Sequence, residues 1–331
     1  MFVSVNGSTS GSFNMICLVV ELFVINDSIT FCSLRIQQME DKNEIIHCHH
    51  PVSIAEQIKR SKLAVLKLLP LEPRQFVDSD VVQGSQIGNG VFGSVAVAKI
   101  LSMGSVLVAA KTIKMDQSSL LDIQAESRIM QALSGHAHFP YCFGYIKPNI
   151  ILMQLIGTSS NPPSVLTIDN LMQNTILSLC DWINVSTQVV SGICYLHQLL
   201  LLHNDIKSDN VILEPTTKRA VIIDFGKVTT IENPLTYCLN AEQRRKYNKH
   251  HRHLAHELRY SAGTQQSVMT DTYSIGYLIK YIGYYTKHDE LYNIGRRMKT
   301  SYVSERMDLK TAYDLLSKMS YHFSKLKTFS N

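Results

Sequence analysis

Polar side chains in two neighbouring segments have the types and the order that phosphoryl transfer requires. Residues 203–210 are His-Asn-Asp-Ile-Lys-Ser-Asp-Asn, and a second segment, Asp224-Phe-Gly226, follows an apolar run. Phosphoryl transfer needs a carboxylate at the attacking hydroxyl, a cation near the γ-phosphate, and carboxylate and amide oxygens that hold Mg²⁺. Asp205 and Lys207 are therefore the candidate catalytic residues, and Asn210 and Asp224 are the candidate Mg²⁺ ligands.

A glycine-rich segment earlier in the chain has the composition of a phosphate-binding loop. Gly88-Asn89-Gly90 and Gly93 lie between two apolar runs, and glycines let backbone N–H groups approach phosphate oxygens closely. The next run ends at Lys111, and Glu126 in the following segment could pair with this lysine. A dinucleotide-binding fold would place a helix after the glycines, whereas a strand is predicted here. The order of the motifs favours ATP over a dinucleotide.

Two regions of different character must position these residues. Apolar runs rich in β-branched residues predict strands, and spacings of three and four predict a helix over residues 118–133. Beyond Asn161-Pro-Pro163 the pattern becomes helical, most clearly between Trp182 and Leu200. The strands are predicted at residues 81–87, 95–100, 106–113, 141–146 and 150–156. These patterns predict an antiparallel sheet with one helix, followed by a mainly α region.

With these motifs the sequence resembles the eukaryotic protein kinase family over residues 81 to about 320. The resemblance implies an α+β bilobal fold, with a five-stranded antiparallel sheet and one helix in an N-lobe at about 81–157. A mainly α C-lobe would occupy about 158–331. It implies transfer of the γ-phosphoryl group of Mg-ATP to Ser or Thr hydroxyls of proteins, because Lys207 stands two residues after Asp205. The residues that it assigns to ATP binding are Gly88, Asn89, Gly90, Gly93, Val95, Ala109, Lys111, Glu126, Met153, Gln154, Ile156 and Ile212.

Three further residues resemble structural elements of the kinase C-lobe. Ala255-His-Glu257 resembles the A-P-E motif, Asp271 the aspartate of helix αF, and Arg306 the arginine that pairs with Glu257. By the same resemblance Met153 is the gatekeeper in front of the hinge.

Departures from the family pattern leave a second function open. Asn204 replaces the arginine of the H-R-D motif, so no cation at this position can bind an activation-loop phosphate. His250 stands where many serine/threonine kinases have a threonine that contacts the catalytic aspartate and lysine, and His256 replaces the proline of A-P-E. The alternative is a pseudokinase or nucleotide-binding scaffold without catalysis. A small-molecule phosphotransferase of kinase-like fold is the third hypothesis.

Length and composition bound the organisation of the chain. Its 331 residues are 45% hydrophobic and 18% charged, which indicates a globular protein, and a net charge of +5 is too small to indicate nucleic-acid binding. We expect a kinase domain at 76–331 after an N-terminal extension, residues 1–75, of unknown role. Within this extension, residues 22–36 favour strands, 54–69 have helical spacing, and His47-Cys-His-His50 is a weak candidate for zinc.

The remaining sequence features concern partners and compartment. Seven scattered cysteines without a C-x-x-C pair are typical of a reducing compartment, so a cytoplasmic or nuclear location is expected, and no membrane span is predicted. The basic block 244–252 has three interpretations: a solvated loop, an attraction for acidic protein substrates, or a nuclear-import signal. The expected partner is a protein substrate, with no preference for an oligomeric state.

Overall fold

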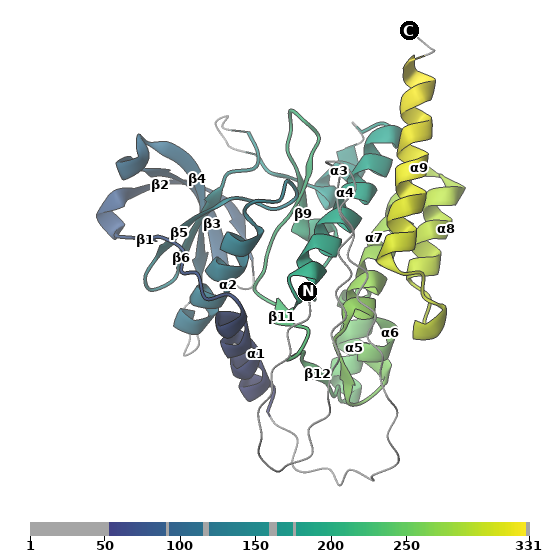
Figure 1. Cartoon of the computed structure of the whole chain (residues 1–331), viewed down its shortest axis with the longest axis horizontal. Coiled ribbons are helices and arrows are strands. Elements are labelled where there is room, and N and C mark those ends of the chain that lie inside the picture. Colours follow the sequence, from purple (N-terminus) through teal and green to yellow (C-terminus); the bar gives the residue numbers. More distant parts are fainter. Residues whose placement is uncertain (1–52, 91–92, 115–118, 159–163, 175–176, 329–331) are drawn as a thin grey trace, which may run out of the picture. The chain divides into compact units, whose positions relative to one another are not determined.

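The computed structural model describes residues 53–90, 93–114, 119–158, 164–174 and 177–328. Residues Val52–Asn331 form one compact unit, which contains a sheet-rich N-lobe and a helical C-lobe (Figure 1). The predicted strands at 22–36 and the candidate zinc site at His47-Cys-His-His50 lie outside the described residues. In the described part of the chain, no helix has the length and apolar character needed to cross a membrane.

The N-lobe sheet has six strands rather than the five that the resemblance implies. Five of them match the predicted runs closely, and neighbours among these five pair antiparallel. The sixth strand, β1, pairs parallel with β5 at one edge, where Gln75 lies opposite Tyr145. A two-residue strand is too short to show an alternating pattern. The sheet order is β1-β5-β6-β4-β3-β2, with β1 Gln75–Phe76, β2 Val81–Asn89, β3 Gly93–Ile100, β4 Val106–Ile113, β5 Cys142–Ile146 and β6 Ile150–Gln154.

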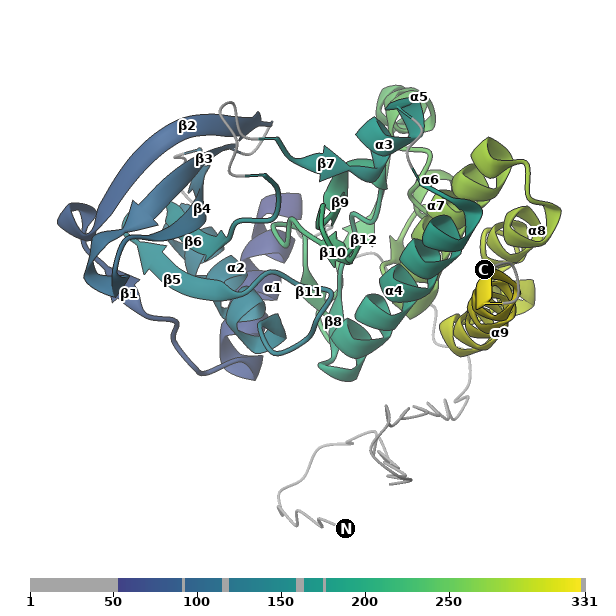
Figure 2. The ribbon, with the colours of Figure 1, turned by 90° about the horizontal axis from the view of Figure 1, so that it is seen from above.

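Two helices, α1 (Ile54–Leu68) and α2 (Ser119–Leu133), pack together beside this sheet (Figure 2). Helix α1 begins after Ser53, whose side chain accepts a hydrogen bond from Glu56 N–H. Arg128 of α2 donates to the carbonyl oxygens of Leu66 and Leu69 at the end of α1, at 3.0 and 3.2 Å. The last carbonyls of α1 are thereby satisfied by a cation, which also suits the helix dipole.

The C-lobe is built around α4 (Leu179–Gln198), whose residues Trp182, Val189 and Ile193 are buried at helical spacing, as the sequence predicts. A long helix, α7 (Val268–Thr286), lies between α4 and α8 (Asp289–Met298) in Figure 1. The remaining helices are α3 (Ile168–Asn174), α5 (Ala241–His250), α6 (His256–Tyr260) and α9 (Leu309–Thr328). Short strands connect them: β7 (Leu166–Thr167), β8 (Leu201–Leu202), β9 (Val211–Leu213), β10 (Ala220–Ile222), β11 (Thr229–Thr230), β12 (Thr236–Tyr237) and β13 (Thr264–Gln265).

Helices α7 and α8 approach each other closely because glycine occupies their contact. A Cβ atom at Gly295 of α8 would collide with the backbone nitrogen of Lys280 in α7. The absence of this atom lets the two backbones meet, so a substitution here would push the helices apart. Lys280 is thereby held beside the first turns of α8.

Most of the basic block is helical rather than a loop. Helix α5 covers residues up to His250, and Asn240 and Gln243 form a capping box at its start, each side chain bonding the other's backbone N–H. The helix buries no residue, so it lacks the apolar periodicity from which a helix is predicted. The capping residues Asn240 and Gln243 are the local sequence signal that could have indicated this helix.

Candidate active site

The catalytic loop is held in place by a buried carboxylate of α7. Asp271 accepts hydrogen bonds from the backbone N–H groups of His203 and Asn204, both at 2.8 Å. His197 of α4 contacts the same carboxylate at 2.9 Å. Three hydrogen bonds to one buried aspartate fix the backbone immediately before Asp205.

Asp205 lies in this loop with 1% of its surface exposed, and three polar side chains converge on its carboxylate. Lys207 Nζ lies 3.4 Å from Oδ2, whereas Lys227 Nζ and His253 Nε2 lie 3.0 and 3.2 Å from Oδ1. Burial alone would raise the pKa of Asp205, but the His253 hydrogen bond and the two lysines outweigh it and hold the pKa far below its ordinary value. Asp205 is therefore ionised at neutral pH.

The contact expected of His250 belongs to His253. His250 ends α5, whereas His253 lies three residues farther on, in the segment that reaches Asp205. Neither His253 nor Lys227 was predicted, and no local motif marks them.

Asn210 is oriented by the catalytic loop itself. Its amide nitrogen donates to the backbone oxygen of Asp205 at 2.8 Å and to Oδ2 of the same residue at 3.2 Å. The amide oxygen is then the atom that can bind a cation. Together with a carboxylate oxygen of Asp224 it forms a set of hard oxygen donors of the kind that Mg²⁺ prefers. The residues present fit this metal when substrate phosphates complete its coordination.

The predicted lysine pair is formed, and it extends to a third residue. Lys111 Nζ of β4 lies 2.6 Å from Glu126 Oε1 of α2 and 2.9 Å from Asp224 Oδ1. Burial disfavours the charged lysine, but the two carboxylates outweigh it and raise the pKa of Lys111. Burial likewise acts to raise the pKa of Asp224, and Lys111 lowers it below its ordinary value. One cation thus joins β4, α2 and the Asp224-Phe-Gly226 segment.

Most of the residues assigned to ATP binding lie on β2, β3, β4, β6 and the C-lobe strand β9, while Glu126 lies in α2, Gly90 in the turn after β2, and Ile156 just after β6. Gly88 pairs with Val95, and Ala109 of β4 pairs with Met153 of β6. Asn89 ends β2, and the Gly90 N–H donates to the Gly93 carbonyl at 2.8 Å, which closes the turn. At Gly93 a Cβ atom would collide with the backbone oxygen of Thr112, so this glycine is required by packing.

Several of the apolar residues assigned to the nucleotide site are buried. Ile156 and Ile212 belong to one buried cluster with Val221. Ile156 is 4% exposed, so its side chain is part of the core between the lobes. Gln154 is the last residue of β6, and its side-chain Oε1 accepts a hydrogen bond from the backbone N–H of Tyr141 at 3.3 Å.

A buried lysine of α1 contacts the backbone of the Asp224-Phe-Gly226 segment. Lys62 is 4% exposed and donates from Nζ to the Gly226 carbonyl oxygen at 2.6 Å. On the same helix, Gln57 Oε1 accepts from the Thr236 N–H at 2.9 Å. Burial lowers the pKa of Lys62, and nearby carboxylates oppose this effect only in part. The periodicity of 54–69 predicted the helix, but no motif indicated that it reaches the active site.

Asn204 links the catalytic loop to the following segment without a charge. Its backbone is left-handed, with φ 67°, and its amide nitrogen donates to Lys227 O and to Thr229 Oγ1, both at 3.0 Å. A neutral amide therefore forms the connection for which the family pattern uses an arginine. The link needs no phosphate.

The C-lobe contains the expected ion pair below the active site. Arg306 contacts both carboxylate oxygens of Glu257, at 2.8 and 2.9 Å. The arginine is 5% exposed and also donates to the Met269 carbonyl at 2.7 Å. This bidentate pair fixes α6 against the start of α7.

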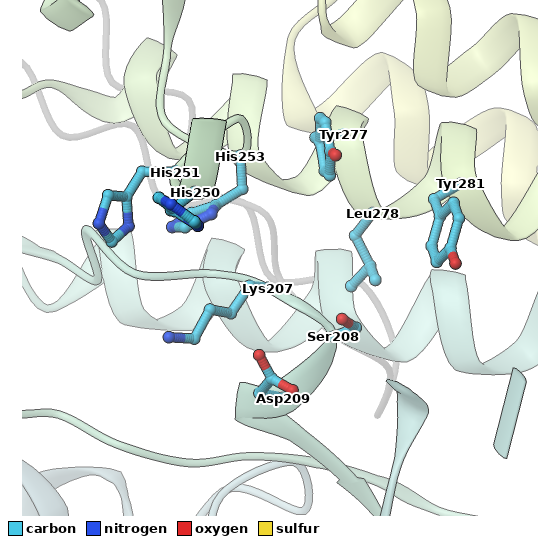
Figure 3. Close-up of a pocket in the computed structure, with 9 residues that line it drawn as sticks. All are labelled: Lys207, Ser208, Asp209, His250, His251, His253, Tyr277, Leu278 and Tyr281. Atoms are coloured by element: carbon cyan, nitrogen blue, oxygen red, sulfur yellow. The ribbon is translucent and has the colours of Figure 1, made fainter. Parts of the chain in front are cut away.

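A pocket of about 190 Å³, here called the catalytic pocket, opens beside Lys207. Its lining residues are Lys207, Ser208, Asp209, His250, His251, His253, Tyr277, Leu278 and Tyr281. Figure 3 shows the histidines gathered above Lys207, while Tyr277 and Tyr281 line the side formed by α7. Burial, followed by the neighbouring His253, lowers the pKa of His251. This pocket adjoins the residue that would bind the γ-phosphate.

A comparison with known families agrees with this geometry. The family model described as "Protein kinase domain" matches residues 81–326, about three quarters of the chain. The match includes the glycine-rich segment, the lysine pair, the catalytic loop and the ion pair of the C-lobe. The chain belongs to the protein kinase family.

Proposed function

We propose that this protein is a serine/threonine protein kinase that uses Mg-ATP. The observation that carries the proposal is that the polar side chains of the active site form two hydrogen-bonded groups. Lys111 bonds Glu126 and Asp224, and Asn210 bonds Asp205. These groups come from four different segments of the chain. Burying polar groups costs free energy, so stability alone would favour apolar residues at these positions.

Asp205 would act on the hydroxyl of the substrate. Its lowered pKa keeps the carboxylate ionised, so it would orient the hydroxyl and accept its proton late, after the bond between the γ-phosphorus and ADP has largely broken. The new bond joins the hydroxyl oxygen to the γ-phosphorus, and the bond to the bridging oxygen of ADP breaks. Lys207, with about a third of its side chain exposed, can turn from Asp205 to the γ-phosphate.

The phosphates would be held by three groups. Lys111 binds the α- and β-phosphates, and Glu126 keeps it in place. Asn210 and Asp224 supply the oxygens that would hold Mg²⁺, which when bound neutralises charge on the phosphates. The protein thus contributes position and electrostatic stabilisation.

The preference for Ser and Thr, the substrate class and the compartment are finer parts of the proposal. Lys207, two residues after the base, supports Ser/Thr over Tyr. Cations on α5 support acidic protein substrates. The described cysteines, Cys142, Cys180, Cys194 and Cys238, are free thiols, which supports a cytoplasmic or nuclear location.

One observation favours a pseudokinase as the second candidate. Oδ1 of Asp205 already contacts Lys227 and His253, and Asn204 replaces an arginine. If these contacts persist when substrate binds, the carboxylate has less freedom to accept a proton. A catalytic assay separates the two candidates.

The test measures transfer of labelled γ-phosphate from Mg-ATP to a mixed protein substrate, with identification of the labelled amino acid. Asp205→Asn keeps the shape of the side chain and should lower the rate roughly 10²- to 10⁴-fold. Phosphoserine or phosphothreonine that disappears in the variant supports the proposal. No transfer by the unchanged protein, with thermal stabilisation by Mg-ATP intact, would favour the pseudokinase.

A further inference from the structure

A second cavity of the C-lobe, next to the catalytic pocket, has four cations and no carboxylate among its described lining residues. Its volume is about 650 Å³, and its walls include the cations Arg252, Arg259, Lys280 and Lys299. Its other described lining residues are tyrosines and one asparagine. We call this feature the C-lobe cavity.

The cations of the C-lobe cavity are held in position without being neutralised. Lys299 Nζ lies 5.2 Å from the ring centroid of Tyr273, and Lys280 Nζ lies 5.1 Å from that of Tyr292. Contacts with aromatic faces orient an ammonium group but add no negative charge. Among the ion pairs between described residues, none includes a cation of this cavity. Burial and the repulsion from Lys280 and Arg259 lower the pKa of Lys299.

Arg259 provides an independent sign that this cavity suits a polar ligand. It is 9% exposed, and its terminal nitrogens donate to Asn248 Oδ1 and to the Tyr273 hydroxyl at 3.0 and 3.2 Å. Its Nε atom is buried and has no hydrogen-bond partner. A buried guanidinium without a carboxylate is unfavourable. The nearest carboxylate on this helix, Glu257, already binds Arg306 through both oxygens.

The C-lobe cavity adjoins the catalytic pocket. Tyr277 and Tyr281 of α7 line both. A segment of a bound protein can therefore run from the C-lobe cavity past these two tyrosines to Lys207. The occupant is then a part of the substrate rather than of the nucleotide, because none of the residues assigned to ATP binding lines this cavity.

We propose that the C-lobe cavity binds a phosphorylated side chain of the protein substrate, at a position near the hydroxyl that receives the next phosphate. A phosphate monoester carries close to two negative charges and three acceptor oxygens, which match several converging cations better than one carboxylate does. This substrate role rests on the proposed kinase function. The binding step itself does not.

The test compares two libraries of fluorescent peptides that differ only in a fixed central phosphoserine or serine. Binding to the full chain is measured by anisotropy without ATP, so a failure of catalysis leaves this result unaffected. We expect the phosphoserine library to bind about tenfold more tightly or better. The double variant Lys280→Gln/Lys299→Gln should remove this preference, whereas Lys280→Arg/Lys299→Arg should keep it.

Two controls make the outcome decisive. Lys318→Gln removes an exposed lysine of α9 outside the cavity and should leave the preference unchanged. Thermal stabilisation of the double variant by Mg-ATP should equal that of the unchanged protein, which shows that it is folded. Equal binding of the two libraries, or a preference that survives Lys280→Gln/Lys299→Gln, would overturn the proposal. So would a glutamate-substituted library that binds as tightly as the phosphoserine library.

Discussion

Lys111 of the active site lies against carboxylates, whereas Lys280 and Lys299 of the C-lobe cavity lie against tyrosine rings. Lys111 has two carboxylate oxygens within 2.9 Å, and the pKa of this lysine is raised. Lys299 has a ring centroid at 5.2 Å, and its pKa is lowered. The same fold thus contains one site whose charges are balanced within the protein and one whose balance requires a ligand.

A similar contrast occurs between two arginines around Tyr273. Arg306 stacks at 5.2 Å from the centroid of this ring and binds Glu257, while Arg259 donates to its hydroxyl and has no carboxylate. Chemically identical side chains a short distance apart therefore differ in their need for an anion. Removing a cation that is paired with a carboxylate should therefore lower the free energy of unfolding, whereas removing an unpaired cation should not.

The largest effect should come from Asp224→Asn. The amide keeps the shape but removes the charge that contacts Lys111 and that would hold Mg²⁺. We expect phosphotransfer to fall by about 10²-fold or more, with loss of the Mg²⁺-dependent part of nucleotide binding. Initial rates and thermal shifts with and without Mg²⁺ measure this. A normal rate in the variant would refute the assignment of Asp224.

Lys111→Met should destabilise the fold as well as weaken nucleotide binding. The change leaves Glu126, which is 3% exposed, as a buried carboxylate without its cation. Breaking a buried pair in this way should lower the free energy of unfolding by about 3 kcal/mol. Urea denaturation measures it, and Lys99→Met, at an exposed position of β3, is the control. A loss no larger than that of the control would contradict the importance of the pair.

Lys62→Met should reduce the rate without destabilising the protein. The variant loses the hydrogen bond to Gly226 O, which is worth about 1 kcal/mol, so we expect a fall in kcat of roughly threefold to tenfold. It also removes an amine whose burial disfavours charge, so the free energy of unfolding should stay nearly constant. Lys59→Met, at an exposed position of α1, should leave kcat unchanged. Equal rates for both variants would show that α1 does not support the active site.

Lys280→Gln should not lower the free energy of unfolding, in contrast to Lys111→Met. The change removes repulsion from Lys299 and breaks no ion pair between described residues. We expect the free energy of unfolding to stay constant or to rise by up to about 0.5 kcal/mol, because partial exposure screens the repulsion. Chemical denaturation beside Lys318→Gln provides the comparison. A clear destabilisation would mean that this cation already has a compensating anion within the protein.

The smallest effect is a dependence on alkaline pH. The pKa of Lys299 is lowered from 10.5 by burial and by Lys280 and Arg259, while Tyr292 opposes the shift. Lys299 therefore loses its proton at a lower pH than an ordinary lysine, so the preference for phosphoserine peptides should weaken as the pH rises from neutral toward 10.5, before an ordinary lysine would lose its charge. Anisotropy titrations across this range measure it. A preference that stays constant would exclude Lys299 from the binding site.

Much of the fold followed from the sequence because its signals are local. The runs that became β3 to β6 are mainly apolar, β2 leads into the glycine-rich segment, and the spacing from Trp182 to Leu200 gives α4 within three residues. The motif residues come together because Lys111 lies near the end of β4, Asp205 follows β8, and Asp224 follows β10. Strand β1 and helix α5 were missed because one has two residues and the other buries none.

The missed site residues depend on contacts between distant segments. Lys62 lies 164 positions before Gly226, and His253 lies 48 positions after Asp205. Nothing near either residue in the sequence distinguishes it from an ordinary surface lysine or histidine. The C-lobe cavity likewise collects cations from separate elements, and only the packing of α7 on α8 brings Lys280 and Lys299 together.

The measurement that tests the difference between the two sites most directly is steady-state kinetics on a matched pair of peptides, with and without a phosphoserine near the acceptor. Asp205→Asn should lower kcat equally for both peptides. Lys280→Gln/Lys299→Gln should raise KM about tenfold for the phosphorylated peptide alone and leave both kcat values unchanged. If the double variant instead lowers kcat for both peptides, or leaves both KM values unchanged, the C-lobe cavity is not a phosphate-binding site separate from the catalytic residues.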